Sequence, residues 1–338
     1  MSAGTVLVAR LDSMGDMLLA GPAIRAVART AERVVVLAGP RGEPAARLLP
    51  DVDEILVWCS PWIDPDPPKI DRDDVAHLVE RVAAAGVDEA VVLTSFHQSP
   101  LPLALLLRLA GVGRISAISD DYPGSLLDLR HRVEQGMPET ERALSLVEAA
   151  GFRLAPGDHG DPAIVSCLPD TRRLTGPGPN DHVAVHVGAD APARELPTAL
   201  GAEVVASLSA QGDRVVVTGS DHSRAEAVAG GHGLNLAGRT STAELADVLR
   251  RARVLVAGNT GPAHLAAAVG TPVVSLFAPV VPASAWAPQG VARRILGDQT
   301  APCAGTRSRV CPVPGHPCLD GVTTQDVLNA IKELEATG

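Results

Sequence analysis

The sequence predicts an α/β protein made of two doubly wound domains in series. Short apolar, β-branched runs alternate with helical segments along both halves of the chain, a pattern typical of parallel sheets with helices on both faces. The length of 338 residues suits about two domains, each large enough to bury its own core. A stretch rich in Pro, Gly and Asp over 155–181 separates the two halves.

The first half shows this alternation from its first strand onward. Strands are expected at 5–11, 33–38, 54–58, 89–96 and 114–118, and helices at 17–30, 73–85, 101–110 and 139–150. Residues 60–70 contain four prolines and cannot form regular structure. This segment is either a lid beside a site or a connector, and we favour the connector.

The alternation restarts after the Pro/Gly-rich stretch. Strands are expected at 182–187, 214–218, 234–236, 254–256 and 273–277, and helices at 198–210, 223–229, 242–251 and 262–269. We therefore expect an N-terminal domain over 1–160, a linker over 161–181 and a C-terminal domain over 182–322. A last helix over 323–338 can pack back on the N-terminal domain.

The charge balance argues against several kinds of partner. The formal net charge is −10 and no basic block is present, which argues against a nucleic-acid partner and limits membrane contact to a peripheral one. The sequence has no long apolar stretch and no charged leader. We therefore expect a soluble protein of the cytoplasm.

The cysteines give a weak signal. Cys303, Cys311, Cys318 and His316 gather in a Pro/Gly-rich loop, where a metal clip is conceivable, although the spacing matches neither a zinc pair nor a disulfide framework. Reduced loop cysteines are favoured for a cytosolic chain, and no metal is expected.

The turn at 258–261, G-N-T-G, is the first candidate site. It follows a β-branched run and precedes a small-residue helix that opens with Pro262, which a helix tolerates best at its first position. Free N–H groups and the positive end of the helix dipole favour an anion there, most often a phosphate. The alternative is that Asn259 or Thr260 only caps the helix.

The first strand ends in R-L-D-S-M-G-D-M at 10–17. This segment is neither a Walker loop nor a G-x-G-x-x-G dinucleotide motif. It places two carboxylates, Asp12 and Asp16, at the carboxyl end of the strand. They either cap the following helix or supply a general base that faces an interdomain cleft.

Three more residues of the second half carry two interpretations each. Arg194 follows the first strand and suits phosphate oxygens, or is a solvated surface arginine. Asp221 follows the second strand and can bind a ribose diol or cap the next helix. His264 lies inside an apolar helix, where we favour a structural role.

Four segments carry a resemblance to a known family. They are V-L-V-A-R-L-D-S-M-G-D-M-L-L-A-G-P-A-I-R-A-V at 6–27, N-L-A-G-R-T-S-T-A-E-L-A at 235–246, G-N-T-G-P-A-H-L-A-A-A-V-G-T-P-V-V-S-L-F at 258–277 and C-P-V-P-G-H-P-C-L at 311–319. Together they resemble glycosyltransferase family 9, the ADP-heptose:lipopolysaccharide heptosyltransferase family. The resemblance implies the GT-B fold, in which two Rossmann-like domains face an interdomain cleft.

The resemblance also implies site residues. Asp16 is then the catalytic base, Arg194 replaces a lysine that contacts the diphosphate, and Asn259 replaces an aspartate that contacts the donor sugar. The rest of the expected donor site is Asp221, Thr260, Gly261 and His264. On the acceptor side we expect Ser13, Gly15, His97 and Gln98, of which the last two follow the strand at 89–96.

The implied activity is an inverting, metal-independent transfer of a sugar, heptose in the family, from an ADP-sugar to an acceptor hydroxyl. No cofactor is expected, and the acceptor is a glycan or a small molecule. Two alternatives stay open, a GT-B nucleotide-sugar epimerase and a non-catalytic nucleotide-binding module.

Overall fold

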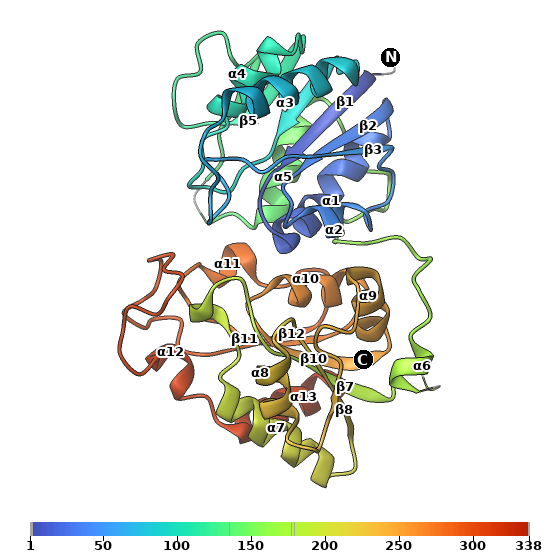
Figure 1. Ribbon diagram of the computed structural model, residues 1–338, viewed down its shortest axis with the longest axis vertical. Helices are drawn as coiled ribbons and strands as arrows, with labels where there is room; N and C mark the ends of the chain where they lie inside the picture. Colours follow the sequence, from blue (N-terminus) through green and yellow to red (C-terminus); the bar gives the residue numbers. More distant parts are fainter. Residues whose placement is uncertain (1–2, 135, 177, 179, 337–338) are drawn as a thin grey trace. The chain divides into compact units, whose positions relative to one another are not determined.

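The computed structural model describes residues 3–134, 136–176, 178 and 180–336. The chain divides into two compact units, Met1–Val165 and Ser166–Gly338. Within the described residues, each unit holds one six-stranded, all-parallel sheet with helices on both faces (Figure 1). The predicted fold class is confirmed.

The first sheet has the strand order β3-β2-β1-β4-β5-β6. Its strands are β1 (Ala3–Arg10), β2 (Ala31–Ala38), β3 (Glu54–Val57), β4 (Glu89–Val92), β5 (Arg114–Ile118) and β6 (Leu129–His131). Its helices are α1 (Met14–Ala28), α2 (Glu43–Ala46), α3 (Arg72–Ala84), α4 (Leu101–Leu109) and α5 (Glu139–Ala150). The order reverses between β1 and β4, which makes the carboxyl ends of these two strands the expected ligand position of a doubly wound sheet.

The first core forms on both faces of β1. On one face, Leu7 and Ala9 pack with Leu78 of α3 and Leu103 of α4. On the opposite face, α1 and α5 contact each other and the strands of the sheet. Because successive strand residues point to opposite faces, a strand covered on both sides must be apolar throughout. The V-L-V-A run at 6–9 meets this requirement, and all four residues are buried.

The second sheet repeats the topology, with the strand order β12-β11-β10-β7-β8-β9. Its strands are β7 (His182–His186), β8 (Arg214–Thr218), β9 (Leu234–Asn235), β10 (Ala252–Gly258), β11 (Val273–Leu276) and β12 (Arg293–Leu296). Its helical segments are α6 (Arg172–Thr175), η1 (Pro192–Arg194), α7 (Thr198–Ala210), α8 (His222–Ala229), α9 (Thr242–Arg250), α10 (Gly261–Ala268), α11 (Ala283–Trp286), α12 (Pro317–Asp320) and α13 (Thr324–Glu335). Here the order reverses between β7 and β10.

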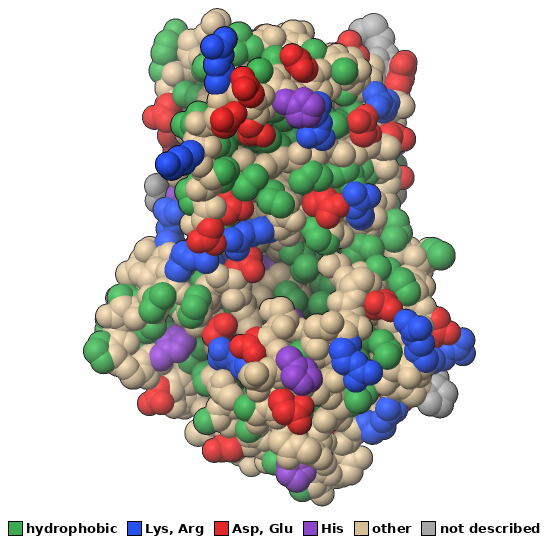
Figure 2. Space-filling view, in the orientation of Figure 1, with side chains coloured by type: hydrophobic (Ala, Val, Ile, Leu, Met, Phe, Trp, Pro, Cys, Tyr) green, Lys and Arg blue, Asp and Glu red, His purple; other side chains and the backbone are tan. Residues whose placement is uncertain are grey.

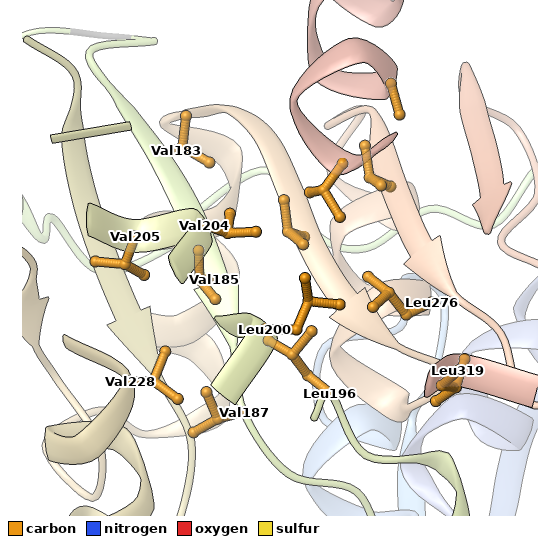
Figure 3. Close-up of a cluster of buried hydrophobic side chains, with 14 of the residues drawn as sticks. Val183, Val185, Val187, Leu196, Leu200, Val204, Val205, Val228, Leu276 and Leu319 are labelled. Carbon is orange, nitrogen blue, oxygen red and sulfur yellow. The ribbon is translucent and has the colours of Figure 1, made fainter. Parts of the chain in front are cut away.

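The second core explains where the last helix packs. Val183 and Val185 of β7, with Val187 directly after the strand, face Val204 of α7 and Val228 of α8 (Figure 3). The apolar face of α13 joins this same cluster and contacts β10, β11 and β12. The apolar face of this helix is therefore buried within the second unit, and its packing on the N-terminal domain stays a prediction.

Two edge strands, β6 and β12, were not expected from the sequence. Their sequences, L-R-H and R-R-I-L, are short and only partly buried, so they lack the apolar run that marks a central strand. Helix α1 begins at Met14 and not at residue 17. The prediction missed its first turn because this turn contains Gly15 and Asp16 and shows no apolar periodicity.

The surface offers no extended single-sign field on the side shown in Figure 2, where Lys and Arg side chains lie among Asp and Glu. In the part of the chain that the structure describes, we find no helix with the length and apolar character needed to cross a bilayer.

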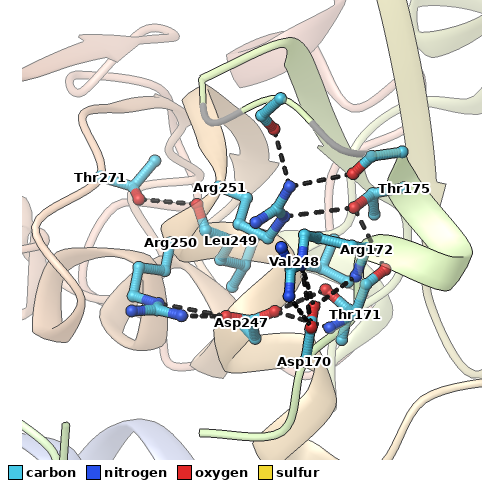
Figure 4. Close-up of polar contacts among 12 residues, drawn as sticks. Asp170, Thr171, Arg172, Thr175, Asp247, Val248, Leu249, Arg250, Arg251 and Thr271 are labelled. Atoms are coloured by element: carbon cyan, nitrogen blue, oxygen red, sulfur yellow. Dashed lines mark hydrogen bonds and ion pairs between the residues drawn. The ribbon is translucent and has the colours of Figure 1, made fainter.

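The segment expected as a linker is anchored to the second unit. The backbone N–H and the hydroxyl of Thr171 both donate to Asp247 Oδ2, at 2.9 and 2.7 Å (Figure 4). Asp247 Oδ1 accepts from Arg250, and Arg251 donates to the carbonyl of Gly176 at 2.9 Å. These contacts fix 171–176 on α9 and its end, so this part of the expected linker is an ordered strap.

We predict that Asp247→Ala lowers the free energy of unfolding by about 2 kcal/mol, because two donors of the buried Thr171 lose a charged acceptor. Asp170→Ala is the matched control, because Asp170 and its partner Arg172 are exposed. Urea unfolding followed by circular dichroism measures both variants. Equal losses of stability would contradict the anchoring role of Asp247.

Candidate functional site

The carboxyl ends of β1 and β4 gather the first group of polar side chains. Arg10 is the last residue of β1 and is only 3% exposed, and Ser95 follows β4. A buried guanidinium needs partners for its five N–H groups, because burial without them is costly. Side chains on the loop after β1, on α1, after β4 and on α5 lie against this guanidinium.

Arg10 is the centre of this carboxylate cluster, which comprises Arg10, Asp12, Asp16, Ser95 and Glu139. Its Nε lies 2.8 Å from Asp12 Oδ2, and its Nη2 donates to Asp16 Oδ1 and to Ser95 Oγ, each at 2.9 Å. Both Nη atoms lie 3.3 Å from Oε2 of Glu139, the first residue of α5. One guanidinium thus holds three carboxylates.

Asp16 lies in the first turn of α1, and its side chain stays 17% exposed. The hydroxyl and the backbone N–H of Ser13, the N-cap residue, donate to Asp16 Oδ2 at 2.8 and 3.4 Å. The predicted capping role is therefore present. It does not exclude base chemistry, because a partly exposed carboxylate fixed by Arg10 and Ser13 can still meet an acceptor hydroxyl.

Asp12 has an unusual charge environment. Burial raises its pKa to about 6 and the negative charge of Asp16 adds to this rise, while Arg10 and the Gln98 amide oppose it. Burial also raises the pKa of Glu139. Arg142 Nε lies 3.9 Å from Glu139 Oε1, so two guanidinium groups face three carboxylates. Asp12 therefore keeps its proton to a higher pH than an ordinary aspartate does.

The expected acceptor-side residues separate into two groups. Ser13 and Gln98 join the carboxylate cluster, since the Gln98 amide donates to Asp12 Oδ1. Gly15 is buried in the first turn of α1. His97 is exposed, and its ring packs edge-on against Phe96 at a centroid distance of 5.3 Å.

Sequence reasoning missed Arg10, Ser95 and Glu139 as members of this cluster. Arg10 had a detectable signal, because a charge at the end of an apolar strand must find partners. Glu139 had none, since nothing near it in the sequence distinguishes it from an exposed helix-start carboxylate.

The second group of candidate residues lies at the carboxyl ends of β7 and β10. Glycine is required at Gly258, the last residue of β10, because a Cβ there would lie 2.0 Å from the carbonyl oxygen of Arg194. This close approach brings the backbone of Arg194, which follows β7, against the strand that enters the Asn259–Gly261 turn. The structure thus brings together two segments that the sequence separates by more than 60 residues.

The turn leaves polar groups available beside the helix N-terminus. Thr260 is the N-cap of α10, and its side chain makes no capping bond. Asn259 is 7% exposed; its Nδ2 donates to Ala278 O at 3.4 Å, and its Oδ1 has no hydrogen-bond partner among the described residues. The capping interpretation of both side chains is therefore not supported. His264 is buried inside α10, as expected.

The loop that contains Arg309 and His316 holds the segment that carries Arg194. Ala193 N donates to Arg309 O at 2.9 Å, and His316 Nε2 lies 3.0 Å from Ala193 O. Arg309 also donates to Asp190 O at 3.0 Å. His316 thus has a structural contact, and the loop holds the segment that carries Arg194.

Asp221 and His186 complete this edge. Asp221 caps α8, with its Oδ1 accepting from Arg224 N at 3.0 Å, so the capping alternative is realised with one of its two oxygens. His186 ends β7, and its Nδ1 lies 3.0 Å from Thr218 Oγ1. Burial lowers the pKa of His186 to about 4, so this ring is neutral at physiological pH.

The cysteines differ in burial, and Cys167 is exposed. Cys303 and Cys318 are buried in the second core, where burial raises the pKa of Cys318 to about 12. No disulfide joins the described cysteines. Among the described residues, no group of three or more His, Cys, Asp or Glu is placed to hold a metal ion.

About two thirds of the chain matches the model of a known family. The model of glycosyltransferase family 9 (heptosyltransferase) matches residues 97–316. A search of curated proteins gives no match.

Solved structures match over nearly the full chain. ADP-heptose lps heptosyltransferase II of E. coli is similar at 20% identity, with 98% of this chain and 99% of that chain covered and a TM-score of 0.75. A glycosyl transferase family 9 protein of Veillonella parvula gives 15% identity, 100% and 98% coverage and a TM-score of 0.79. E. coli heptosyltransferase WaaC with ADP-2-deoxy-2-fluoro heptose gives 20% identity, 97% and 99% coverage and a TM-score of 0.71. The shared fold is the GT-B fold that the sequence predicts.

We predict that Asp12 makes the stability of the protein pH-dependent. Its pKa in the folded state, about 6, lies above its ordinary value of 3.8, so the folded state binds the proton more tightly than the unfolded state. The stabilisation is therefore fully present below about pH 4 and is lost as the pH rises through about 6.

Urea unfolding at a series of pH values compares the wild type with Asp12→Asn. Between about pH 4 and 6 the free energy of unfolding of the wild type should fall relative to that of the variant, which lacks this titration. Parallel curves for the two proteins would mean that Asp12 does not titrate in this range.

Proposed function

Because the chain belongs to glycosyltransferase family 9, we propose that it transfers heptose from ADP-heptose to an acceptor hydroxyl, with inversion and without a metal ion. The observation that carries the proposal is the partly exposed Asp16 carboxylate, fixed between Arg10 and Ser13 at the strand-order reversal of the first sheet. A general base needs this combination of fixed geometry and access to the substrate.

The second unit offers the features of a donor site. The N-terminus of α10, entered through Asn259 and Thr260, suits a diphosphate because helix N-termini favour anions. Arg194 is proposed to bind the same diphosphate, since its guanidinium can donate two bonds at once. The structure of the similar protein WaaC holds ADP-2-deoxy-2-fluoro heptose, and this supports our proposal of ADP-heptose as the donor.

The proposed reaction is a single displacement. Asp16 takes the proton of the acceptor hydroxyl while the oxygen of that hydroxyl forms a bond to the anomeric carbon of the donor. The bond from that carbon to the diphosphate breaks on the opposite face, and ADP leaves with the electron pair. Arg194 and the N–H groups of the α10 N-terminus stabilise the negative charge that develops on the leaving group.

The other predicted residues receive supporting roles in this proposal. Asp221 keeps one oxygen outside its cap for a ribose hydroxyl, and Asn259 Oδ1 is an acceptor for a hydroxyl of the donor sugar. Ser13 and Gln98 border the acceptor beside Asp16. His97, which is exposed, would contact only a large acceptor.

Family membership does not favour the two alternatives, an epimerase or a non-catalytic nucleotide-binding module. The acceptor class, a glycan or a small molecule, stays a prediction, as does the cytoplasmic location. The exclusion of nucleic acid rests on the acidic net charge of −10.

Calorimetric titration with ADP, UDP, GDP and ADP-heptose tests the donor. We expect selective binding of ADP and a higher affinity for ADP-heptose than for ADP. In Arg194→Gln the affinities for ADP and for ADP-heptose should both fall, because a charge-assisted contact to the diphosphate is lost. Arg293→Gln is a control on the same unit, since Arg293 donates to the carbonyl of Pro288 at the edge strand. A preference for UDP or GDP would overturn the assigned donor.

We predict that Asp16→Asn lowers kcat by about 10² to 10⁴-fold, because the amide cannot accept the acceptor proton. The affinity for ADP-heptose should stay close to that of the wild type. ADP release in the presence of lipopolysaccharide-core and small-molecule acceptors measures the rate, and circular dichroism checks the fold. Near wild-type turnover in the variant would refute the base assignment, and a loss of wild-type activity in EDTA would refute metal independence.

A further inference from the structure

Glu139 is a buried charge that the proposed chemistry does not use directly. It opens α5, 123 residues beyond Asp16 in the sequence, and its side chain is only 3% exposed. Its strongest contacts run to Arg10, at 3.3 Å from both Nη atoms. A carboxylate in this position costs desolvation energy unless a partner compensates it, so its presence needs an account.

The guanidinium of Arg10 links Glu139 to Asp16. Arg10 Nη2 touches Glu139 Oε2 at 3.3 Å and Asp16 Oδ1 at 2.9 Å. A guanidinium is planar and its donors have fixed directions, so a carboxylate that fixes one side of the fork also orients the other side. Ser95 Oγ, at 2.9 Å from the same Nη2, further restricts the rotation of the group.

We propose that Arg10 and Glu139 are positioning residues that orient the Asp16 carboxylate for the transfer reaction. This inference rests on the proposed role of Asp16 as the base. Neither residue needs to touch a substrate: Glu139 holds Arg10, and Arg10 holds Asp16. Helices α1 and α5, which contact each other along one face of the sheet, supply the two outer members of this chain of contacts.

The two positioning residues have opposite electrostatic effects on Asp16. The positive charge of Arg10 favours the ionised form of a neighbouring carboxyl group, whereas the negative charge of Glu139 disfavours it. The other charged groups that face the cluster are Asp12 on the loop after β1 and Arg142 on α5, and both are unchanged in the variants below. Neutralising Arg10 and neutralising Glu139 must therefore shift the titration of Asp16 in opposite directions.

A ¹³C NMR titration of the aspartate carboxyl groups tests this in the full-length protein, with the Asp16 signal assigned by its absence in Asp16→Asn. In Arg10→Gln we expect the titration midpoint of Asp16 to rise by about 1 pH unit or more. In Glu139→Gln we expect it to fall. The matched control is Glu141→Gln, because Glu141 lies in the same first turn of α5 but is exposed.

The pH profile of kcat/KM gives the second readout. Its acid limb should move with the NMR midpoint, and kcat in Glu139→Gln should fall by up to about 10²-fold while the KM for the donor stays unchanged, because orientation is lost and donor binding is not. A residue with only a structural role would change stability without moving the acid limb. Glu139→Gln keeps the shape of the side chain, so it remains informative if Arg10→Gln does not fold.

An Asp16 midpoint that is the same in Glu139→Gln and Glu141→Gln, or that moves in the same direction in both cluster variants, overturns the positioning proposal. Opposite shifts together with a wild-type protein that transfers no sugar support the positioning pair and overturn the proposed transferase function. The two failures are thereby distinguished.

Discussion

The reversal of strand order in each parallel sheet is the constraint on which both groups of candidate residues depend. In a parallel sheet all strands end at the same edge, and at a reversal the connections of two neighbouring strands leave in opposite directions and open a space between them. The reversal lies between β1 and β4 in the first sheet and between β7 and β10 in the second. The carboxylate cluster occupies the first position, and the Asn259–Gly261 turn with Arg194 occupies the second.

The two groups of candidate residues differ in their electrostatics. In the first unit, carboxylates surround the guanidinium of Arg10, which is 3% exposed. The guanidinium stabilises the ionised form of each carboxyl group, whereas burial and the neighbouring carboxylates destabilise it. That balance fixes geometry and tunes protonation. In the second unit, the candidate features are a helix N-terminus, an amide and one arginine, which are fixed dipoles and a permanent charge. A fixed positive field suits an anionic leaving group, whereas a tunable carboxylate suits proton transfer.

Close backbone packing supports the segment that carries Arg194. Gly258 allows the carbonyl of Arg194 to approach β10 where any other residue would clash. The loop that contains Arg309 and His316 braces the same segment from the other direction through hydrogen bonds to residues 190 and 193. The cysteines of this region serve the packing of the second core, because Cys303 and Cys318 are buried among aliphatic side chains.

Local sequence determined much of this protein. The alternation of buried strands and helices defined both doubly wound units, and the segments after the strands marked Asp12, Asp16, Arg194 and the 258–261 turn, because these signals depend only on neighbours along the chain. Only the tertiary structure decided that Glu139 meets Arg10, that Arg194 lies against Gly258, that α13 covers the second sheet, and that β6 and β12 form edges. Each of these contacts joins residues that lie far apart in the sequence. Burial and charge compensation in the folded chain determine them, and no local sequence pattern encodes either effect.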